Sequence, residues 1–239
     1  MPAPTHDTFY FGHHKCGTNW MRSILKDTAR ALGLGYEVRG GRADDFTGEP
    51  GAGTVRLYVN PLAECTPESI AEPGRGFHLI RDPRDVLVSQ YWSWKNSHEN
   101  NTPQIESLRA RLQDLSIADG LAALLPHHRM LSQLAGKPIG PNPLVRVVRY
   151  EELWEGGAGS FAELFAFLGL DLPEGEIGSI VDRHSFESRS GRKPGDEDNT
   201  NHLRRGSPGG WREVFTPELE AAFENAWPGE VGRLGYKAG

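Results

Sequence analysis

Apolar residues recur with two different periods along this chain of 239 residues. Short apolar runs, typical of strands that are buried on both faces, occupy residues 8–12, 55–59, 77–80 and 144–148. Segments with apolar residues three or four positions apart, typical of amphipathic helices, lie at 18–32, 83–97, 117–134, 161–168 and 217–227. Strands that alternate with helices predict an α/β fold of three layers, with a central parallel β-sheet flanked by helices.

Between these elements, residues 33–53 are rich in glycine and hold few apolar residues, so we expect a long loop there. The chain length suits one hydrophobic core. We therefore expect residues 1–239 to form a single domain.

The most informative stretch is residues 8–22. A strand breaks at Gly12, a short polar loop carries Lys15 and Gly17, and a helical pattern begins at Thr18. Such a turn directs backbone N–H groups and the positive end of the helix dipole at one point, and Lys15 adds a full charge. The stretch predicts a P-loop-like binding site for a phosphate or sulfate group.

The spacing in this loop differs from that of ATP-dependent P-loop enzymes. Their Walker A loop places lysine directly after the second glycine, whereas Lys15 precedes Gly17 by two positions. A second polar stretch follows the strand at 77–80, where Arg81 and Ser89 lie eight residues apart. An arginine at a strand end and a serine two helical turns later can bind one anion.

Both stretches resemble motifs of the sulfotransferases that use 3′-phosphoadenosine 5′-phosphosulfate (PAPS). The order lysine, any, glycine, threonine, polar, tryptophan from Lys15 to Trp20 is similar to their 5′-phosphosulfate loop. Arg81 to Ser89 is similar to their 3′-phosphate motif, R-[ND]-P-[KR]-D-x-x-x-S. The resemblance implies a PAPS-dependent sulfotransferase that releases 3′,5′-bisphosphoadenosine (PAP) and needs no metal.

Three further segments follow in the family's order. Residues 204–216 resemble the C-terminal R-K-G-x-x-G-D-W signature, with arginine at 205 for lysine and glycine at 210 for aspartate. Trp20, Tyr150 and Phe186 correspond to aromatic residues at the adenine, although an aromatic residue taken alone is more often part of the core. The cofactor-binding residues that the resemblance implies are Lys15, Cys16, Gly17, Thr18, Asn19, Trp20, Arg81, Ser89, Tyr150, Phe186, Arg204, Arg205 and Gly206.

The resemblance fails at the catalytic histidine of the cytosolic enzymes, because Asn60 lies in the matching segment. Lys15 is predicted to stabilise the leaving phosphate, and His13 and His14 are the nearest residues that could act as the general base. Glu49 and Glu64 are weaker candidates, and His78 is expected in the core. A transfer to an amine acceptor would need no protein base.

Charge, apolar runs and cysteine count indicate which classes of partner this chain does not bind. The net charge of −6 argues against a broad nucleic-acid surface. The chain lacks a run of 18 apolar residues and a basic, apolar leader, so we expect a cytoplasmic protein with no membrane partner. Its two cysteines make no disulfide framework or zinc site, and Cys16 is either a small residue that fits the turn or a thiol with a lowered pKa.

The acceptor of the sulfuryl group is open, and so is the oligomeric state. Tyr91, Trp92 and Trp94 fit an apolar pocket for a small aromatic or hydrophobic alcohol as well as they fit core packing, and Arg84 is expected to be a surface charge. Two alternatives remain at this stage. They are a catalytically inactive protein that binds adenosine bisphosphate and a nucleotide kinase on a P-loop-like scaffold.

Overall fold

The computed structural model describes residues 4–39, 44–59, 65–97, 102–135, 137, 139–140 and 142–237. The chain forms two compact units. Unit 1 comprises Met1–Arg81 and Gly136–Arg189, and unit 2 comprises Asp82–Ala135 and Ser190–Gly239. The prediction of one domain over residues 1–239 stays a prediction.

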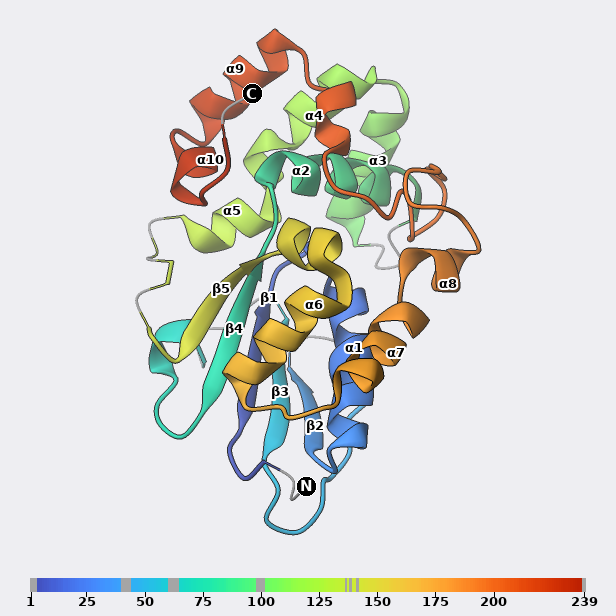
Figure 1. Cartoon of the computed structure of the whole chain (residues 1–239). Helices are drawn as coiled ribbons and strands as arrows, with labels where there is room; N and C mark the ends of the chain where they lie inside the picture. The colour runs from blue at the N-terminus through green and yellow to red at the C-terminus, as the bar shows by residue number, and fades with distance from the viewer. Residues whose placement is uncertain are drawn as a thin grey trace. The chain divides into compact units, whose positions relative to one another are not determined.

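Unit 1 is organised around an all-parallel sheet of five strands in the order β2-β3-β1-β4-β5 (Figure 1). The strands are β1 (Thr8–Gly12), β2 (Gly35–Arg39), β3 (Thr54–Val59), β4 (Arg75–Ile80) and β5 (Val145–Arg149). β1 lies in the middle and is almost fully buried, which explains its continuous apolar sequence. The predicted α/β fold with a central parallel sheet is confirmed.

Helices α1 (Thr18–Ala31), α6 (Tyr150–Leu168) and α7 (Glu174–Arg183) pack their apolar sides into one core with the sheet. α1 contributes Met21, Ile24 and Leu25, which are fully buried at helical spacing. Figure 1 shows these three helices beside one another against the sheet. The unit also holds the short helices η1 (Pro67–Ser69) and α8 (Phe186–Ser190), the latter at its boundary.

Two elements of unit 1 differ from the sequence prediction. β2 lies inside the expected loop of residues 33–53, because Gly35–Arg39 pairs along β3 and Tyr36 is fully buried. α6 begins at Tyr150 rather than near Phe161, since two helical segments join across a kink at Gly157. In both cases sheet pairing and core packing override a weak local pattern.

Unit 2 is helical in the part that the structure describes. α2 (Pro83–Trp92) continues into the π-helical turn η2 (Ser93–Ser97), and the other helices follow in chain order. They are α3 (Pro103–Gln113), α4 (Ile117–Leu124), η3 (Leu125–His127), α5 (Arg129–Leu134), η4 (Gly210–Glu213), α9 (Pro217–Ala226) and α10 (Glu230–Arg233).

Candidate active site

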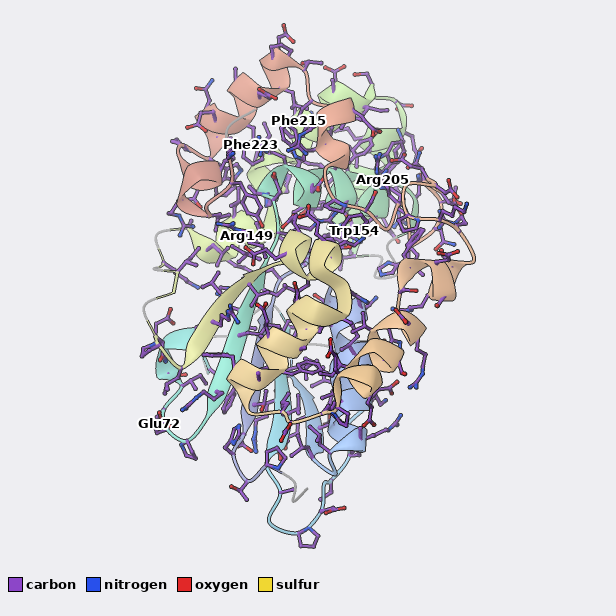
Figure 2. All side chains as sticks on the ribbon, in the orientation of Figure 1. Glu72, Arg149, Trp154, Arg205, Phe215 and Phe223 are labelled. Carbon is purple, nitrogen blue, oxygen red and sulfur yellow. The ribbon has the colours of Figure 1, made fainter. Side chains whose placement is uncertain are left out.

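Residues predicted for the 5′ site, the 3′-phosphate motif and the adenine meet at the carboxyl edge of the sheet in unit 1. β1, β4 and β5 are neighbours and end at Gly12, Ile80 and Arg149. The lysine loop, defined as residues 13–17, follows β1, Arg81 follows β4 and Tyr150 follows β5. Arg149, labelled in Figure 2, marks this end of β5. Parallel strands therefore deliver three segments that are far apart in the chain to one edge, where ligands bind in open α/β sheets.

The backbone of the lysine loop is tightly turned. Lys15 has φ 65° and Gly17 has φ 79°, so two residues of five adopt the left-handed conformation. The carbonyl of His13 accepts hydrogen bonds from the backbone N–H of Cys16 at 3.2 Å and from the hydroxyl of Thr18 at 3.0 Å. No side-chain cap bond is formed at Gly17, and the positive end of α1 faces the loop.

Gly17 is required for steric as well as conformational reasons. A Cβ atom there would lie 2.9 Å from Cδ2 of Tyr150, which is closer than such atoms approach in proteins. A Cβ atom at Gly12 would lie 2.1 Å from the hydroxyl oxygen of Tyr10. The loop backbone therefore passes directly against two tyrosine rings, and both glycines permit this approach.

Arg81 connects the loop to the aromatic residues. Its Nη1 donates to the backbone oxygen of Lys15 at 3.1 Å, and its guanidinium lies 4.6 Å from the ring centre of Tyr150. Trp20 meets the same tyrosine ring edge to face at 5.6 Å. The structure thus brings Lys15, Trp20, Arg81 and Tyr150 together, in an arrangement that suits a phosphate-bearing nucleotide.

His13 occupies a different environment from His14. The His13 side chain is buried, and its Nε2 lies 2.6 Å from Nε2 of His78 on β4. Burial, followed by the neighbouring His13, lowers the pKa of His78 to about 3, so His78 is neutral near pH 7. Nε2 of His13 is thus already engaged by a second ring, whereas His14 is half-buried. The expectation that His78 lies in the core is confirmed.

Cys16 is fully buried in the loop. Burial raises the pKa of its thiol to about 12, against a weaker opposite effect of Arg81. The alternative of a reactive, low-pKa thiol is therefore wrong. Its backbone N–H donates to the carbonyl of His13, so the contacts of Cys16 support the turn of the loop.

Glu49, one of the two glutamates considered as a base, lies far from the lysine loop. Glu49 packs against Gly33, just past the carboxyl end of α1, and a helix of 14 residues spans about 21 Å. Glu49 thus lies at the end of α1 opposite to the lysine loop, which argues against a catalytic role. Glu64, like Asn60, lies outside the described residues.

Other cofactor-binding candidates occupy separate segments. Phe186 begins α8 and is half-buried in unit 1, and Ser89 is half-buried on α2 in unit 2. Arg204, Arg205 and Gly206 also belong to unit 2. The joint use of both units on one nucleotide stays a prediction.

The prediction of Arg84 as a surface charge is wrong, because the residue is 5% exposed. Its guanidinium forms two hydrogen bonds with the carboxylate of Asp82, at 3.0 and 2.8 Å, and lies 3.6 Å from the ring centre of Trp211. The adjacent Asp85 accepts the backbone N–H groups of Gly209 and Trp211 at 2.6 and 3.0 Å. Arg84 and Asp85 therefore fasten the C-terminal signature within unit 2, and this role of Asp85 was missed from the sequence.

Arg204 and Arg205 are held by carboxylates. Oε1 of Glu197 lies 2.7 Å from Nη1 of Arg204 and 2.8 Å from Nη1 of Arg205. Glu213 forms a two-pronged pair with Arg205, at 2.7 and 2.6 Å. The two glutamates were missed because nothing in their spacing marks them as partners of the arginines.

The aromatic residues after Ser89 are mainly packing residues. Tyr91 is fully buried and Trp94 is 4% exposed. The amino group of Lys95 donates to the Tyr91 hydroxyl at 3.1 Å, and Arg129 lies over the Trp94 ring at 5.6 Å. Core packing therefore accounts for Tyr91 and Trp94, while Trp92 is half-buried.

Two features are absent from the part of the chain that the structure describes. None of the helices in this part is both long and apolar enough to cross a membrane. This part also contains no group of three or more His, Cys, Asp and Glu side chains placed to hold a metal ion.

Known proteins resemble this chain over most of its length. Sulfotransferase 2A6 of Mus musculus is 27% identical over 232 residues, covering 92% of this chain and 74% of the mouse protein. Sulfotransferase 2A1 of Homo sapiens is 25% identical over 249 residues, covering 95% of this chain and 85% of the human protein.

Solved structures share the fold at lower identity. Mouse sulfotransferase SULT7A1, complexed with PAP, gives a TM-score of 0.62 at 17% identity and covers 97% of this chain and 86% of its own. Retinol dehydratase, in complex with androsterone and PAP, gives a TM-score of 0.52 at 16% identity, over 95% of this chain and 80% of its own. These similarities confirm the predicted P-loop-like α/β fold.

A family model, described as the sulfotransferase domain, matches residues 63–234. The match includes the segments of Arg81, Tyr150 and Arg204–Gly206, while the lysine loop precedes it and is supported by its geometry. Because the match spans well over half of the chain, this protein belongs to the sulfotransferase domain family.

Proposed function

We propose that this protein is a PAPS-dependent sulfotransferase that transfers a sulfuryl group to a hydroxyl or amine of a small molecule. The observation that carries the proposal is the meeting of Lys15, Arg81 and Tyr150 at one edge of the sheet, beside the positive end of α1. Family membership supports the reaction class. Two structural neighbours were solved with PAP, the product of a PAPS reaction, which supports the choice of cofactor.

The residues present fit such a cofactor. The lysine loop offers a bare helix end, and Gly17 leaves open the position that a Cβ atom would fill. Bound PAPS would supply a sulfuryl group on a phosphate leaving group. Lys15, with backbone N–H groups of residues 17–19, would hold the 5′ end and stabilise the negative charge that grows on the phosphate. The faces of Trp20 and Tyr150 suit a base, and Arg81 offers a guanidinium fork to a phosphate.

We expect most of the rate enhancement to come from the positive charge of Lys15 and the N–H groups at the start of α1. Sulfuryl transfer resembles phosphoryl transfer, in which orientation and electrostatic stabilisation dominate. The turned backbone at Lys15 fixes the direction of the loop before the cofactor arrives, since the carbonyl of Lys15 is tied to Arg81. Little reorganisation is then needed during the transfer.

For the general base we favour His14 over His13. The ring of His13 is buried and in contact with His78, whereas His14 borders Lys15 and is half-buried. His14 would accept the proton of an acceptor hydroxyl as the oxygen attacks sulfur. An amine acceptor would attack through its own lone pair and would not depend on His14.

A small apolar alcohol is the acceptor class that we propose. Retinol dehydratase, one of the structural neighbours, was solved with androsterone. The two sulfotransferase relatives match 92% and 95% of this chain. The net charge of −6 disfavours long anionic acceptors. A cytoplasmic location stays a prediction.

The test combines turnover with binding. Labelled PAPS is incubated with a panel of phenols, steroid alcohols, amines and sugars, and calorimetry compares PAP with AMP. We expect transfer to at least one apolar alcohol and tighter binding of PAP than of AMP. Tight PAP binding with no transfer to any acceptor would instead support an inactive binding protein. ATP consumption that requires Mg²⁺ would support a nucleotide kinase.

A further inference from the structure

The positive charges of Arg204 and Arg205 are each paired with a carboxylate. Glu197 bridges both guanidinium groups through one oxygen, and Glu213 takes up two donors of Arg205. Two arginines thus face two carboxylates. A phosphate that approaches this pair meets groups that are already matched by negative charge.

The two glutamates differ in exposure. The side chain of Glu213 is 60% exposed and that of Glu197 is 34% exposed, while those of Arg204 and Arg205 are 14% and 18% exposed. Glu213 can therefore leave Arg205 and regain its hydration with little change elsewhere. Glu197, which is less exposed and shared by both arginines, is suited to keep the two guanidinium groups together.

The loop that bears the arginines is fastened independently of the glutamates. The backbone N–H of Gly195 donates to the oxygen of Arg205 at 2.8 Å, and that of Asp198 donates to the oxygen of Arg204 at 2.9 Å. Arg192 also donates to the carbonyl oxygens of Arg204 and Leu203. Removal of Glu213 should consequently leave the loop in place and open two donors of Arg205, whose guanidinium still contacts Glu197 and the Ser207 hydroxyl.

The geometry of the Arg205–Glu213 pair is the one that arginine uses for phosphate. Two parallel N–H donors meet two oxygens of one planar anion, as they would meet two oxygens of a phosphate. A phosphate dianion brings more charge than a carboxylate to the same donors. A phosphate dianion can therefore replace Glu213 with the same two hydrogen bonds and a stronger attraction to Arg205. A singly charged anion makes the same bonds with no greater attraction than the Glu213 carboxylate.

We infer that Glu213 is a built-in competitor that occupies Arg205 until a phosphate dianion displaces it, and that Glu197 positions both arginines for that exchange. The inference rests on the proposed function, because the phosphate concerned is the 3′-phosphate of the nucleotide. Glu213 is then a specificity-determining residue, because it weakens the binding of every anion to Arg205. Only a doubly charged anion binds Arg205 strongly enough to displace it.

The test measures the affinities of PAP and AMP by calorimetry for the full chain and its variants. In Glu213→Gln the competing charge is gone, and we expect PAP to bind about 2- to 10-fold more tightly, while AMP binding is unchanged. In Glu197→Gln we expect PAP to bind more weakly, because the shared anchor of the two arginines is lost. Glu106→Gln, at an exposed position of α3, makes the same charge change away from the arginines and should alter neither affinity.

The outcomes separate this inference from the proposed function. If the wild-type protein prefers PAP to AMP but Glu213→Gln leaves PAP affinity unchanged or lowers it, the inference is overturned and the proposed function stands. If the wild-type protein binds PAP and AMP equally, no 3′-phosphate site exists and both fail. Glu213→Ala, which also cannot compete, should reproduce the gain seen with glutamine.

Discussion

The lysine loop and the segment of Arg204 and Arg205 represent two different ways to prepare for a negatively charged group. The lysine loop in unit 1 relies on backbone geometry, a helix end and buried neighbours such as His13 and Cys16. The arginine segment in unit 2 relies on side chains whose charge is matched by Glu197 and Glu213. The lysine loop is fixed by the fold, whereas the arginine segment must exchange Glu213 for the phosphate it binds.

This difference indicates distinct contributions to a reaction. A preorganised backbone costs no rearrangement when charge develops, so it can lower the barrier of the chemical step. Side chains that exchange one anion for another affect mainly how tightly and how selectively the nucleotide binds. We therefore expect substitutions in the lysine loop to lower kcat and substitutions of the glutamates to change affinity.

The strongest expected effect comes from Lys15→Ala. Removal of a charge that faces the leaving phosphate should lower kcat by about 100- to 1000-fold, the range found for single groups that stabilise transition-state charge. Sulfate transfer from labelled PAPS measures the loss. Lys26→Ala serves as the control and should retain turnover. It also removes a lysine, but one that lies within α1 and is paired with Asp44. Equal activity in both variants would contradict the assigned role of Lys15.

Arg81→Ala should affect binding more than chemistry. Loss of a charged hydrogen-bonding group corresponds to about 1.5–3 kcal/mol, so the Kd for PAP should rise about 10- to 100-fold. Arg81→Lys keeps the charge but loses the fork that reaches the Lys15 carbonyl, and it should recover only part of the affinity. Full recovery with lysine would show that charge alone matters at this position.

Gly17→Ala and Gly51→Ala form a matched pair that isolates the contact with Tyr150. The two glycines have nearly the same φ, 79° and 80°, so alanine should cost about 1–2 kcal/mol in the free energy of unfolding at either position. Only at Gly17 would the new Cβ atom meet Tyr150, at 2.9 Å, while nothing lies within 4 Å at Gly51. Urea unfolding and PAP titration should show a larger loss for Gly17→Ala, and identical losses would remove the steric argument.

The smallest expected effect is a pH dependence of the free energy of unfolding, to which His78 beside the lysine loop and the arginine pairs contribute at different pH. The pKa of His78 is about 3 in the folded protein, lowered by burial and then by His13, against about 6.5 when unfolded. Between these values the unfolded chain binds the proton and the folded protein does not, so stability is lost as pH falls below 6.5, by up to about 1.4 kcal/mol per pH unit.

The pH experiment compares urea unfolding of the wild-type protein and His78→Asn between pH 5 and 7. We expect a shallower decline in the variant, because one titrating group is gone, while His128, whose pKa burial lowers to about 4, keeps its own contribution. Arg205 holds the pKa of Glu213 below its usual range, so the stability contributed by that pair should be lost only at a lower pH than the one at which the contribution of His78 begins to fall. Equal slopes in the two proteins would contradict this assignment.

The sequence was sufficient for the fold class and for much of the lysine loop. Apolar runs that alternate with helical periods predicted the parallel sheet, because each strand buried on both faces must be continuously apolar. The start of α1 at Thr18 and the end of β1 at Gly12 were also correct, since a glycine and a helix start leave clear local signals. β2 was missed because pairing along β3, rather than its own composition, makes it a strand.

Side-chain partners were decided only by the tertiary structure. The sequence could not show that His13 would meet His78, 65 residues away, or that Asp85 would bind a turn 124 residues further along. Burial also reversed the expectation for Arg84 and decided between the two alternatives for Cys16. Local sequence determines which backbone conformations a segment favours, whereas burial and pairing depend on which distant segments the fold packs against it.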